Sequence, residues 1–157
     1  MKYKFTHVSK EHAKIAVQNA LGNGSAKKSS LVVSWCTFTD PEIAHVGLYE
    51  KEAQALGIPV LACQLELADN DRAILDGETT GFLKLLVRAG TDEILGATLM
   101  ARHAGEMISE IAVAIAGKTG LAALVQAIHP FPTQAETIRI AAETMYKMMS
   151  AKRKRVA

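Results

Sequence analysis

Two runs of strand-forming residues joined by a short turn most constrain the fold of this 157-residue chain. Residues 81–88 read GFLKLLVR and residues 94–101 read ILGATLMA, with the polar stretch AGTDE between them. Apolar runs separated by three to five residues that include glycine are typical of a β-hairpin. Further strands are predicted at 31–38 (LVVSWCTF) and 60–67 (VLACQLEL). The middle of the chain is therefore expected to form a mainly antiparallel sheet.

The spacing of apolar residues changes from that of a strand to that of a helix after Ala104. Ile108, Ile111 and Ile115 share one helical face, and the last part of this helix, AVAIAG, is apolar nearly all round. A final helix is predicted over 134–150. The other expected helices cover 9–21, 49–57 and 121–128, while Asp40 and Pro41 predict a turn or short helix. Strands followed by helices indicate an α+β domain in which helices flank the sheet.

Composition excludes several classes of protein. With 49% hydrophobic residues, 22% charged residues and a net charge of +2, the chain is expected to be globular and to bind no nucleic acid. Residues 151–157 (AKRKRVA) are predicted to be a basic disordered tail. No apolar run reaches membrane-spanning length and the first residues are too polar for a signal peptide, so a cytoplasmic protein is expected. Cys36 and Cys63 lie 27 residues apart and are expected to be free thiols. The spacing of the histidines predicts no metal site.

The stretch IHPFPTQAE (128–136) holds the candidate for chemistry. Thr133 and Glu136 form the T-x-x-E pattern of a helix capping box, and the two prolines make the preceding link stiff and extended. His129 is therefore held in a rigid lead-in, and a histidine with a nearby carboxylate such as Glu136 is suited to general acid/base catalysis. The alternative is that Glu136 serves only the capping box and that His129 is simply the residue at which the chain enters the helix.

Four motifs taken in order resemble one family. They are FTDPEIAHVGL (38–48), GFLKLLV (81–87), ILGATLMARHAGEMISEIAVAI (94–115) and IHPFPTQAE (128–136). Together they resemble the C-terminal dimerisation domain of the FAD-dependent pyridine nucleotide-disulfide oxidoreductases, which include glutathione reductase, dihydrolipoamide dehydrogenase and mercuric reductase. The resemblance covers residues 31–150. Residues 1–30, with the helix 9–21, resemble the end of the preceding FAD domain, so the chain looks like the last third of a larger enzyme.

The resemblance implies a homodimer in which each His-Pro segment reaches the partner subunit's active site. His129 would then be the base that takes and returns the proton of the interchange thiol, and Glu136 would orient it. The backbone of His129 and Pro130 would lie against the partner's flavin. FAD and NAD(P) would belong to the full-length enzyme and its missing domains, whereas the fragment is expected to bind neither and to have no turnover.

Two departures from the family pattern bear on the substrate. Glutathione reductase and dihydrolipoamide dehydrogenase read H-P-T-x-x-E. If His129 is aligned with their histidine, the present sequence reads H-P-F-P-T-x-x-E, with Phe131 and Pro132 inserted. Mercuric reductases usually have a tyrosine where His129 stands and end in a cysteine pair, which argues for a disulfide or thiol-linked acceptor here. The alternative function is a stand-alone homodimeric binding or assembly module without redox activity. The apolar stripe of the last helix (Ile138, Ala142, Met145 and Met149) and the AVAIAG segment are the features that predict a dimer interface.

Overall fold

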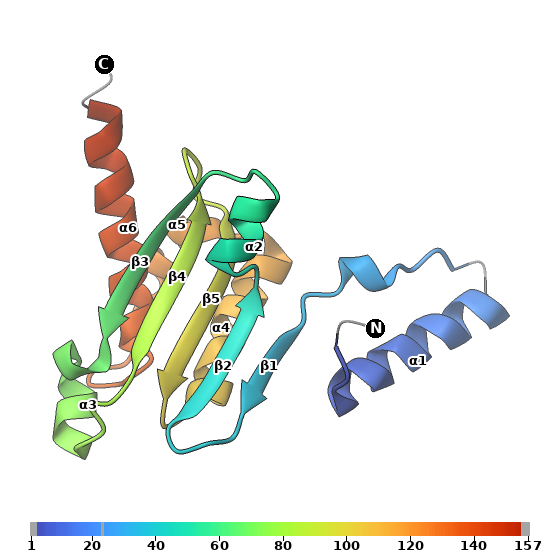
Figure 1. Cartoon of the computed structure of the whole chain (residues 1–157), viewed down its shortest axis with the longest axis horizontal. Coiled ribbons are helices and arrows are strands. Elements are labelled where there is room, and N and C mark those ends of the chain that lie inside the picture. The colour runs from blue at the N-terminus through green and yellow to red at the C-terminus, as the bar shows by residue number, and fades with distance from the viewer. Residues whose placement is uncertain (1–2, 23, 155–157) are drawn as a thin grey trace.

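The computed structural model describes residues 3–22 and 24–154, and its centre is a five-stranded antiparallel sheet (Figure 1). The strands lie in the order β1-β2-β5-β4-β3. Their bounds are β1 Ser34–Thr37, β2 Glu42–Gly47, β3 Val60–Glu66, β4 Phe82–Arg88 and β5 Ile94–Ala101. The helices are α1 Thr6–Leu21, α2 Glu50–Ala55, α3 Asp71–Asp76, α4 Ala104–Gly117, α5 Gly120–Gln126 and α6 Glu136–Lys154, with 3₁₀ turns at Lys28–Ser30 and Leu67–Asp69. The predicted α+β class is confirmed.

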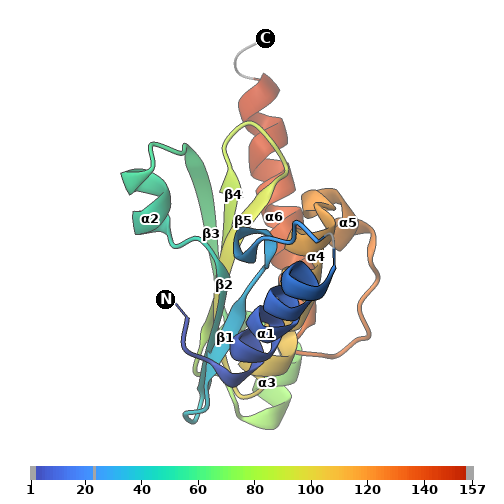
Figure 2. The ribbon, with the colours of Figure 1, turned by 90° about the vertical axis from the view of Figure 1, so that its right-hand side faces the viewer.

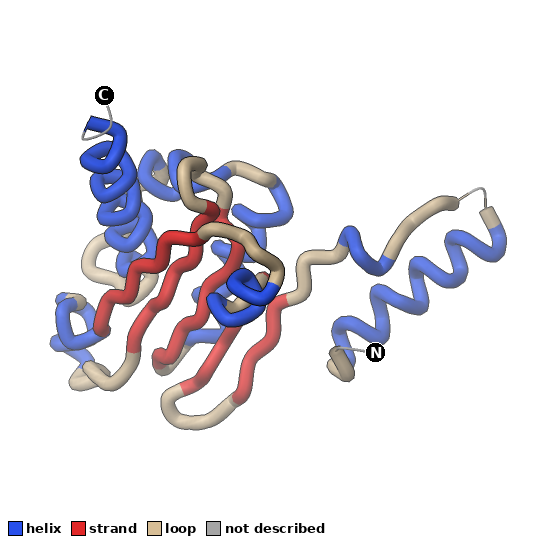
Figure 3. Tube along the Cα trace, turned by 45° about the horizontal axis from the view of Figure 1, so that its top comes forward, coloured by secondary structure: helices blue, strands red, loops and turns tan. Residues whose placement is uncertain are grey.

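The two faces of the sheet are covered to different extents. The helices α4, α5 and α6 lie on one face, whereas only the short helix α2 lies on the other, near one end of the strands (Figure 2). Helix α4 contacts β2 and β5, and α6 contacts β3 and β4. Helix α1 stands beyond the edge strand β1, connected to it by an extended linker (Figure 3). The main core therefore lies between the sheet and the layer formed by α4–α6.

Every second side chain of a strand points toward the helices, and these side chains form one side of the core. Leu83, Leu85 and Val87 of β4 all point toward the helices and are fully buried. The helices supply the other side with the apolar residues Met107, Ile108, Ile111, Leu121, Leu124, Ile138, Ala141, Ala142 and Met145. The apolar stripe of α6 is thus used within the chain, and it is not the free surface that the sequence suggested for a dimer interface.

Most of the predicted elements are confirmed, and the differences have physical causes. The hairpin forms as β4 and β5, and α2, β3, α4 and α5 fall within two or three residues of their predicted bounds. Helix α1 starts at Thr6 instead of Ser9, because the Ser9 amide already bonds the Phe5 carbonyl. Helix α6 continues to Lys154, so its backbone runs into the segment expected to be a tail. Residues 155–157 lie outside the described residues.

Two elements were not predicted from the sequence. Strand β2 follows the turn at Asp40–Pro41 and pairs with β1 on one side and β5 on the other. Helix α3 forms in the polar stretch after β3, where the Asn70 side chain accepts a hydrogen bond from Ala73 N (3.0 Å) and Gly77, at φ 71°, ends the helix. This helix matters for the site, because Asn70 also contacts the start of α6.

Candidate functional site

The segment 127–135 connects α5 to α6 and forms the outer boundary of the helical side of the molecule (Figure 2). Its first part is exposed: the exposed fraction is 95% for Ile128 and 71% for Phe131, and Pro130 is exposed as well. Large apolar side chains with this exposure, on a backbone that two prolines stiffen, are suited to contact another surface. The outer part of the segment is therefore a candidate for contact with a partner.

The inner part of the segment is held by a buried polar network. Asn70, which is 5% exposed, donates from Nδ2 to the Thr133 carbonyl (3.1 Å) and to Thr137 Oγ1 (3.0 Å). Thr133 Oγ1 donates to the Pro130 carbonyl (2.8 Å) and accepts from Glu136 N (3.3 Å). The cap of α3, the end of the segment and the first turn of α6 are thus joined through one amide side chain. This network fixes where the exposed part begins.

The side chain of His129, within the segment, is turned toward α4. Its Nε2 is 2.8 Å from Glu110 Oε1, its Nδ1 is 3.1 Å from the Ala127 carbonyl oxygen, and its side chain is only 8% exposed. Both ring nitrogens lie within hydrogen-bond distance of oxygens of the same chain, so the whole polar edge of the ring is engaged within this subunit. The structure therefore turns the imidazole inward, where the sequence predicted that it would point outward across a subunit boundary.

Glu136 does not meet His129 in this structure. Its carboxylate accepts a hydrogen bond from Arg139 Nη2 (2.9 Å), and Arg139 also donates to Glu143 (2.5 Å). These contacts raise the pKa of Arg139, mainly through the hydrogen bond to Glu136. Only the half of the predicted capping box in which Glu136 N donates to Thr133 is formed. The carboxylate beside His129 is Glu110, which the sequence did not suggest because it lies 19 residues earlier in the chain.

The two cysteines are free and have no features of a reactive thiol. Burial and the neighbouring Glu42 carboxylate raise the pKa of the Cys36 thiol, and burial raises the pKa of Cys63. Glu42 Oε2 accepts from Gly105 N (2.9 Å) in the first turn of α4, with Cys36 Sγ at 3.8 Å. Within residues 3–22 and 24–154 no group of histidine, cysteine and carboxylate side chains could hold a metal ion.

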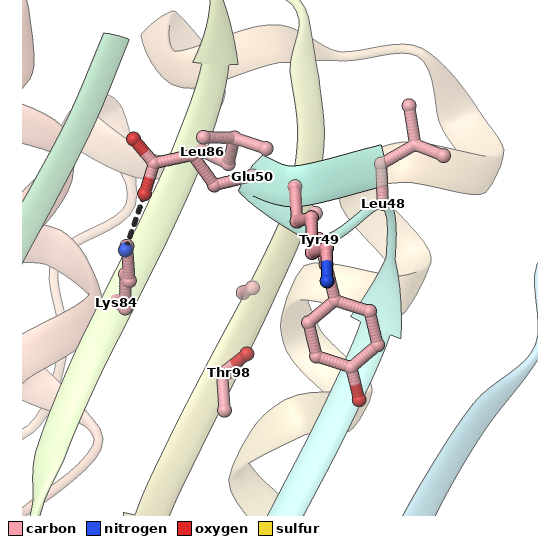
Figure 4. Close-up of a pocket in the computed structure, with 9 residues that line it drawn as sticks. Leu48, Tyr49, Glu50, Lys84, Leu86 and Thr98 are labelled. Carbon is pink, nitrogen blue, oxygen red and sulfur yellow. Dashed lines mark hydrogen bonds and ion pairs between the residues drawn. The ribbon is translucent and has the colours of Figure 1, made fainter. Parts of the chain in front are cut away.

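A hollow of about 300 Å³ lies on the other face of the sheet, beneath the start of α2 (Figure 4). Lys84 Nζ and Glu50 Oε2 form an ion pair there (2.5 Å), and both side chains are more than a third exposed. Beside it, the ring of Tyr49 stacks on His45 with centroids 3.7 Å apart and Nδ1 of His45 is 2.9 Å from Thr98 Oγ1. These contacts satisfy a buried histidine and fix α2 on the sheet, so we assign the hollow no catalytic role.

Comparison with known proteins shows which family this chain resembles in sequence. Residues 33–142 match the sequence profile of the pyridine nucleotide-disulphide oxidoreductase dimerisation domain. Similar proteins include a mercuric reductase of Staphylococcus aureus, 35% identical over 147 residues, which covers 94% of this chain and 27% of that protein. A dihydrolipoyl dehydrogenase of Geobacillus stearothermophilus is 35% identical over 137 residues, covering 87% and 29% of the two chains.

Solved structures agree with this result. The HOCl-induced flavoprotein disulfide reductase RclA of Escherichia coli aligns with a TM-score of 0.82 at 25% identity, over 90% of this chain and 33% of that one. LpdA of Mycobacterium tuberculosis aligns with a TM-score of 0.82 at 29% identity, over 92% and 31%. The chain belongs to the family of pyridine nucleotide-disulfide oxidoreductase dimerisation domains. It spans between about a quarter and a third of the length of these relatives.

The resemblance found in the sequence is therefore confirmed, with the match beginning at residue 33 and ending at residue 142. In the part of the chain that the structure describes, no helix combines the length and the apolar character needed to cross a bilayer.

Proposed function

We propose that this chain is the dimer-forming third of a flavin-dependent disulfide oxidoreductase and that its segment 127–136 completes the active site of the partner subunit. The observation that carries the proposal is the segment itself: the exposed apolar side chains of Ile128, Pro130 and Phe131 lie next to an anchor that is buried and hydrogen-bonded at Asn70. The match to a dimerisation domain supports a second subunit as the surface that this segment meets.

The cofactors in this proposal belong to the part of the relatives' length that this chain does not span. FAD, when bound there, supplies a route for electrons between NAD(P)H and a dithiol. This chain fits a contact with such a cofactor at one place, because Ile128, Pro130 and Phe131 offer an exposed, stiff and mostly apolar edge to a planar ring. Its role there is to cover the ring and exclude water, not to hold the cofactor alone.

The same proposal predicts that the isolated chain neither binds FAD tightly nor oxidises NAD(P)H. The test is to purify the chain, record its absorbance spectrum and measure its mass by light scattering. A colourless dimer near twice 16.9 kDa, without NAD(P)H oxidase activity, supports the proposal. A yellow protein with stoichiometric flavin, or a strict monomer at every concentration, refutes it. A colourless dimer whose gene ends at these residues favours the stand-alone module instead.

An acid/base role for His129, oriented by Glu136, demands two rearrangements of this structure. The imidazole has to leave Glu110 and the Ala127 carbonyl, and Glu136 has to leave Arg139. The chain offers no second histidine in the segment, so acid/base catalysis from this subunit depends on those changes.

A further inference from the structure

Within that proposed function, on which this inference rests, we infer that Phe131 is the side chain presented to the partner's dithiol–flavin site. His129, paired with Glu110, is a positioning residue that holds the segment from inside. The active site then receives an apolar ring from this subunit in place of a proton-exchanging group. Three independent features of the chain lead to this assignment.

The first feature is exposure. Phe131 is 71% exposed, whereas the His129 side chain, two residues earlier, is 8% exposed. Contacts set the direction of the His129 side chain. Its Nδ1 lies near the Ala127 carbonyl oxygen, and its Nε2 lies near the Glu110 carboxylate on α4. Breaking that pair would leave a carboxylate and an imidazole without partners in a half-buried place, which is unfavourable. Phe131 needs no such change to meet an approaching surface.

The second feature is the anchor, which fixes the register of the segment. Thr133 and Glu136 make the capping contact, and Asn70 binds the Thr133 carbonyl, so the stretch Pro132-Thr133-x-x-Glu136 is in place as a unit. In the family pattern H-P-T-x-x-E, the P-T-x-x-E part fits this unit without any insertion. The position before Pro132 is then the family's histidine position, and Phe131 occupies it. The two-residue insertion inferred from the sequence is not needed.

The third feature is chemical. The phenyl ring has no ionisable group, so it can neither take a proton from a thiol nor return one. It can pack against a flat ring or a disulfide and keep water away from them. In the assembled enzyme, proton exchange at the dithiol would then depend on solvent or on groups outside this chain. Such a site favours an acceptor that does not need a protonated donor from this subunit.

The test uses the full-length flavoenzyme that the proposed function requires, with a small disulfide as the probe substrate. The variants are Phe131→His, Phe131→Ala and His129→Gln, with two matched controls: Phe131→Leu, which keeps an apolar side chain, and His103→Gln at an exposed histidine outside the segment. For each variant, kcat and KM are measured from pH 5.5 to pH 9, and the flavin content and the dimer mass are recorded.

We expect H129Q to lower kcat by less than about tenfold and to leave the shape of the pH profile unchanged, since general acid/base catalysts contribute about 10² to 10⁴. The F131A variant should lose about fivefold in kcat/KM, which corresponds to one apolar aromatic contact, and F131L should lose less than F131A because it keeps part of the apolar cover. The F131H variant should gain an ionisation in the histidine range that the native profile lacks.

The inference is overturned if H129Q costs about tenfold or more in kcat, or if it removes a limb of the pH profile, since both are the signature of an acid/base group. It is also overturned if F131A behaves like the native enzyme. These outcomes differ from the outcome that would refute the proposed function. That function fails if the full-length gene yields no flavin-containing dimer that reduces the disulfide. H129Q protein that retains flavin and dimer mass shows that folding is not the cause of a lost activity.

Discussion

The buried amide of Asn70 provides the sharpest test of how the segment is held. The change is Asn70→Ala, which removes three hydrogen bonds: those to Ala73 N (3.0 Å), to the Thr133 carbonyl (3.1 Å) and to Thr137 Oγ1 (3.0 Å). These bonds join the N-terminus of α3 to the end of the segment and the first turn of α6. Their loss should therefore lower the free energy of unfolding and loosen the segment together.

The magnitude follows from the burial of each partner. Loss of an asparagine cap costs about 1 kcal/mol. The Thr137 hydroxyl sits on a residue that is 2% exposed, and leaving a buried polar group without a partner costs about 1–3 kcal/mol. The Thr133 carbonyl is half-buried, so water can replace part of what it loses. We expect a total of about 3 kcal/mol, which lowers the Tm of a domain of this size by about 6–12 °C.

The assay is urea unfolding followed by circular dichroism, at one fixed protein concentration because a dimer's stability depends on concentration. Asn19→Ala is the matched control: Asn19 also bonds backbone groups, at Ala26 O (3.0 Å) and Ala26 N (3.2 Å), but it is exposed, so we expect less than about 0.5 kcal/mol. Asn70→Asp separates the parts of the effect, since aspartate caps a helix equally well but cannot donate. If N70A or N70D is as stable as the native chain, the anchor has no energetic role and the argument for the register of the segment is wrong.

Two further predictions concern single side chains. His103 should react with diethyl pyrocarbonate much faster than the shielded His129, and Glu110→Gln should bring the rate at His129 toward that of His103; equal rates in the native chain, mapped by mass spectrometry, would contradict the inward placement. Alkylation of Cys36 at pH 8 should be slow because burial and Glu42 raise the pKa of its thiol, and Glu42→Gln should speed it up. Since the folded chain holds this proton more tightly than the unfolded chain, its contribution to stability is present below about pH 8.5 and is lost as the pH rises through the higher folded pKa. Thermal melts at pH 7 and pH 10 test that sign, and a chain that is more stable at pH 10 would refute it.

The parts of the fold that could be predicted are those that a local pattern determines. The hairpin of β4 and β5 alternates around a glycine-containing turn, and the apolar residues of α4 recur at helical spacing, so both elements are visible without knowledge of their neighbours. Strand β2 is different. His45 and Glu42 interrupt its apolar residues, and it is stabilised by pairing with β1 and β5 on both sides. β1 is its neighbour in the sequence, but β5 lies about fifty residues further along the chain, and a strand completed by so distant a partner has little signature of its own.

The short helix α3 is an intermediate case, because its signals are present in the sequence. Asn70 is a favoured cap and Gly77 a favoured terminator, seven residues apart. The stretch between them (DRAILD) is only six residues long, with three adjacent apolar residues, so it is too short to show the apolar spacing that identifies most helices. Recognition of the two caps would have located α3, and with it the amide that anchors the segment.

The direction in which His129 points could not be predicted from its own neighbourhood. The prolines predict a stiff segment, but stiffness does not decide which side chain faces outward. That choice is made by Glu110, which another helix places 2.8 Å from the imidazole. A carboxylate 19 residues away has no signature in local spacing, so the nearer Glu136 was the natural candidate, although Arg139 occupies it in the structure.

The inner and outer parts of the segment are therefore subject to different physical constraints. The inner part is tied through Thr133 and Thr137 to the buried Asn70 amide, so the residue types at these two positions are restricted by folding within one chain. The outer residues Ile128 and Phe131 make few demands on that fold, because they are largely exposed. A change at position 131 can thus replace an ionisable side chain by an apolar one at little cost in stability, while it alters the chemistry offered to a partner. For this reason, we expect Phe131→His to leave the Tm of the isolated chain within about 2 °C of the native value, since an exposed substitution changes stability by less than about 0.5 kcal/mol. A larger drop on differential scanning calorimetry would mean that Phe131 packs within its own chain and is not available to the partner.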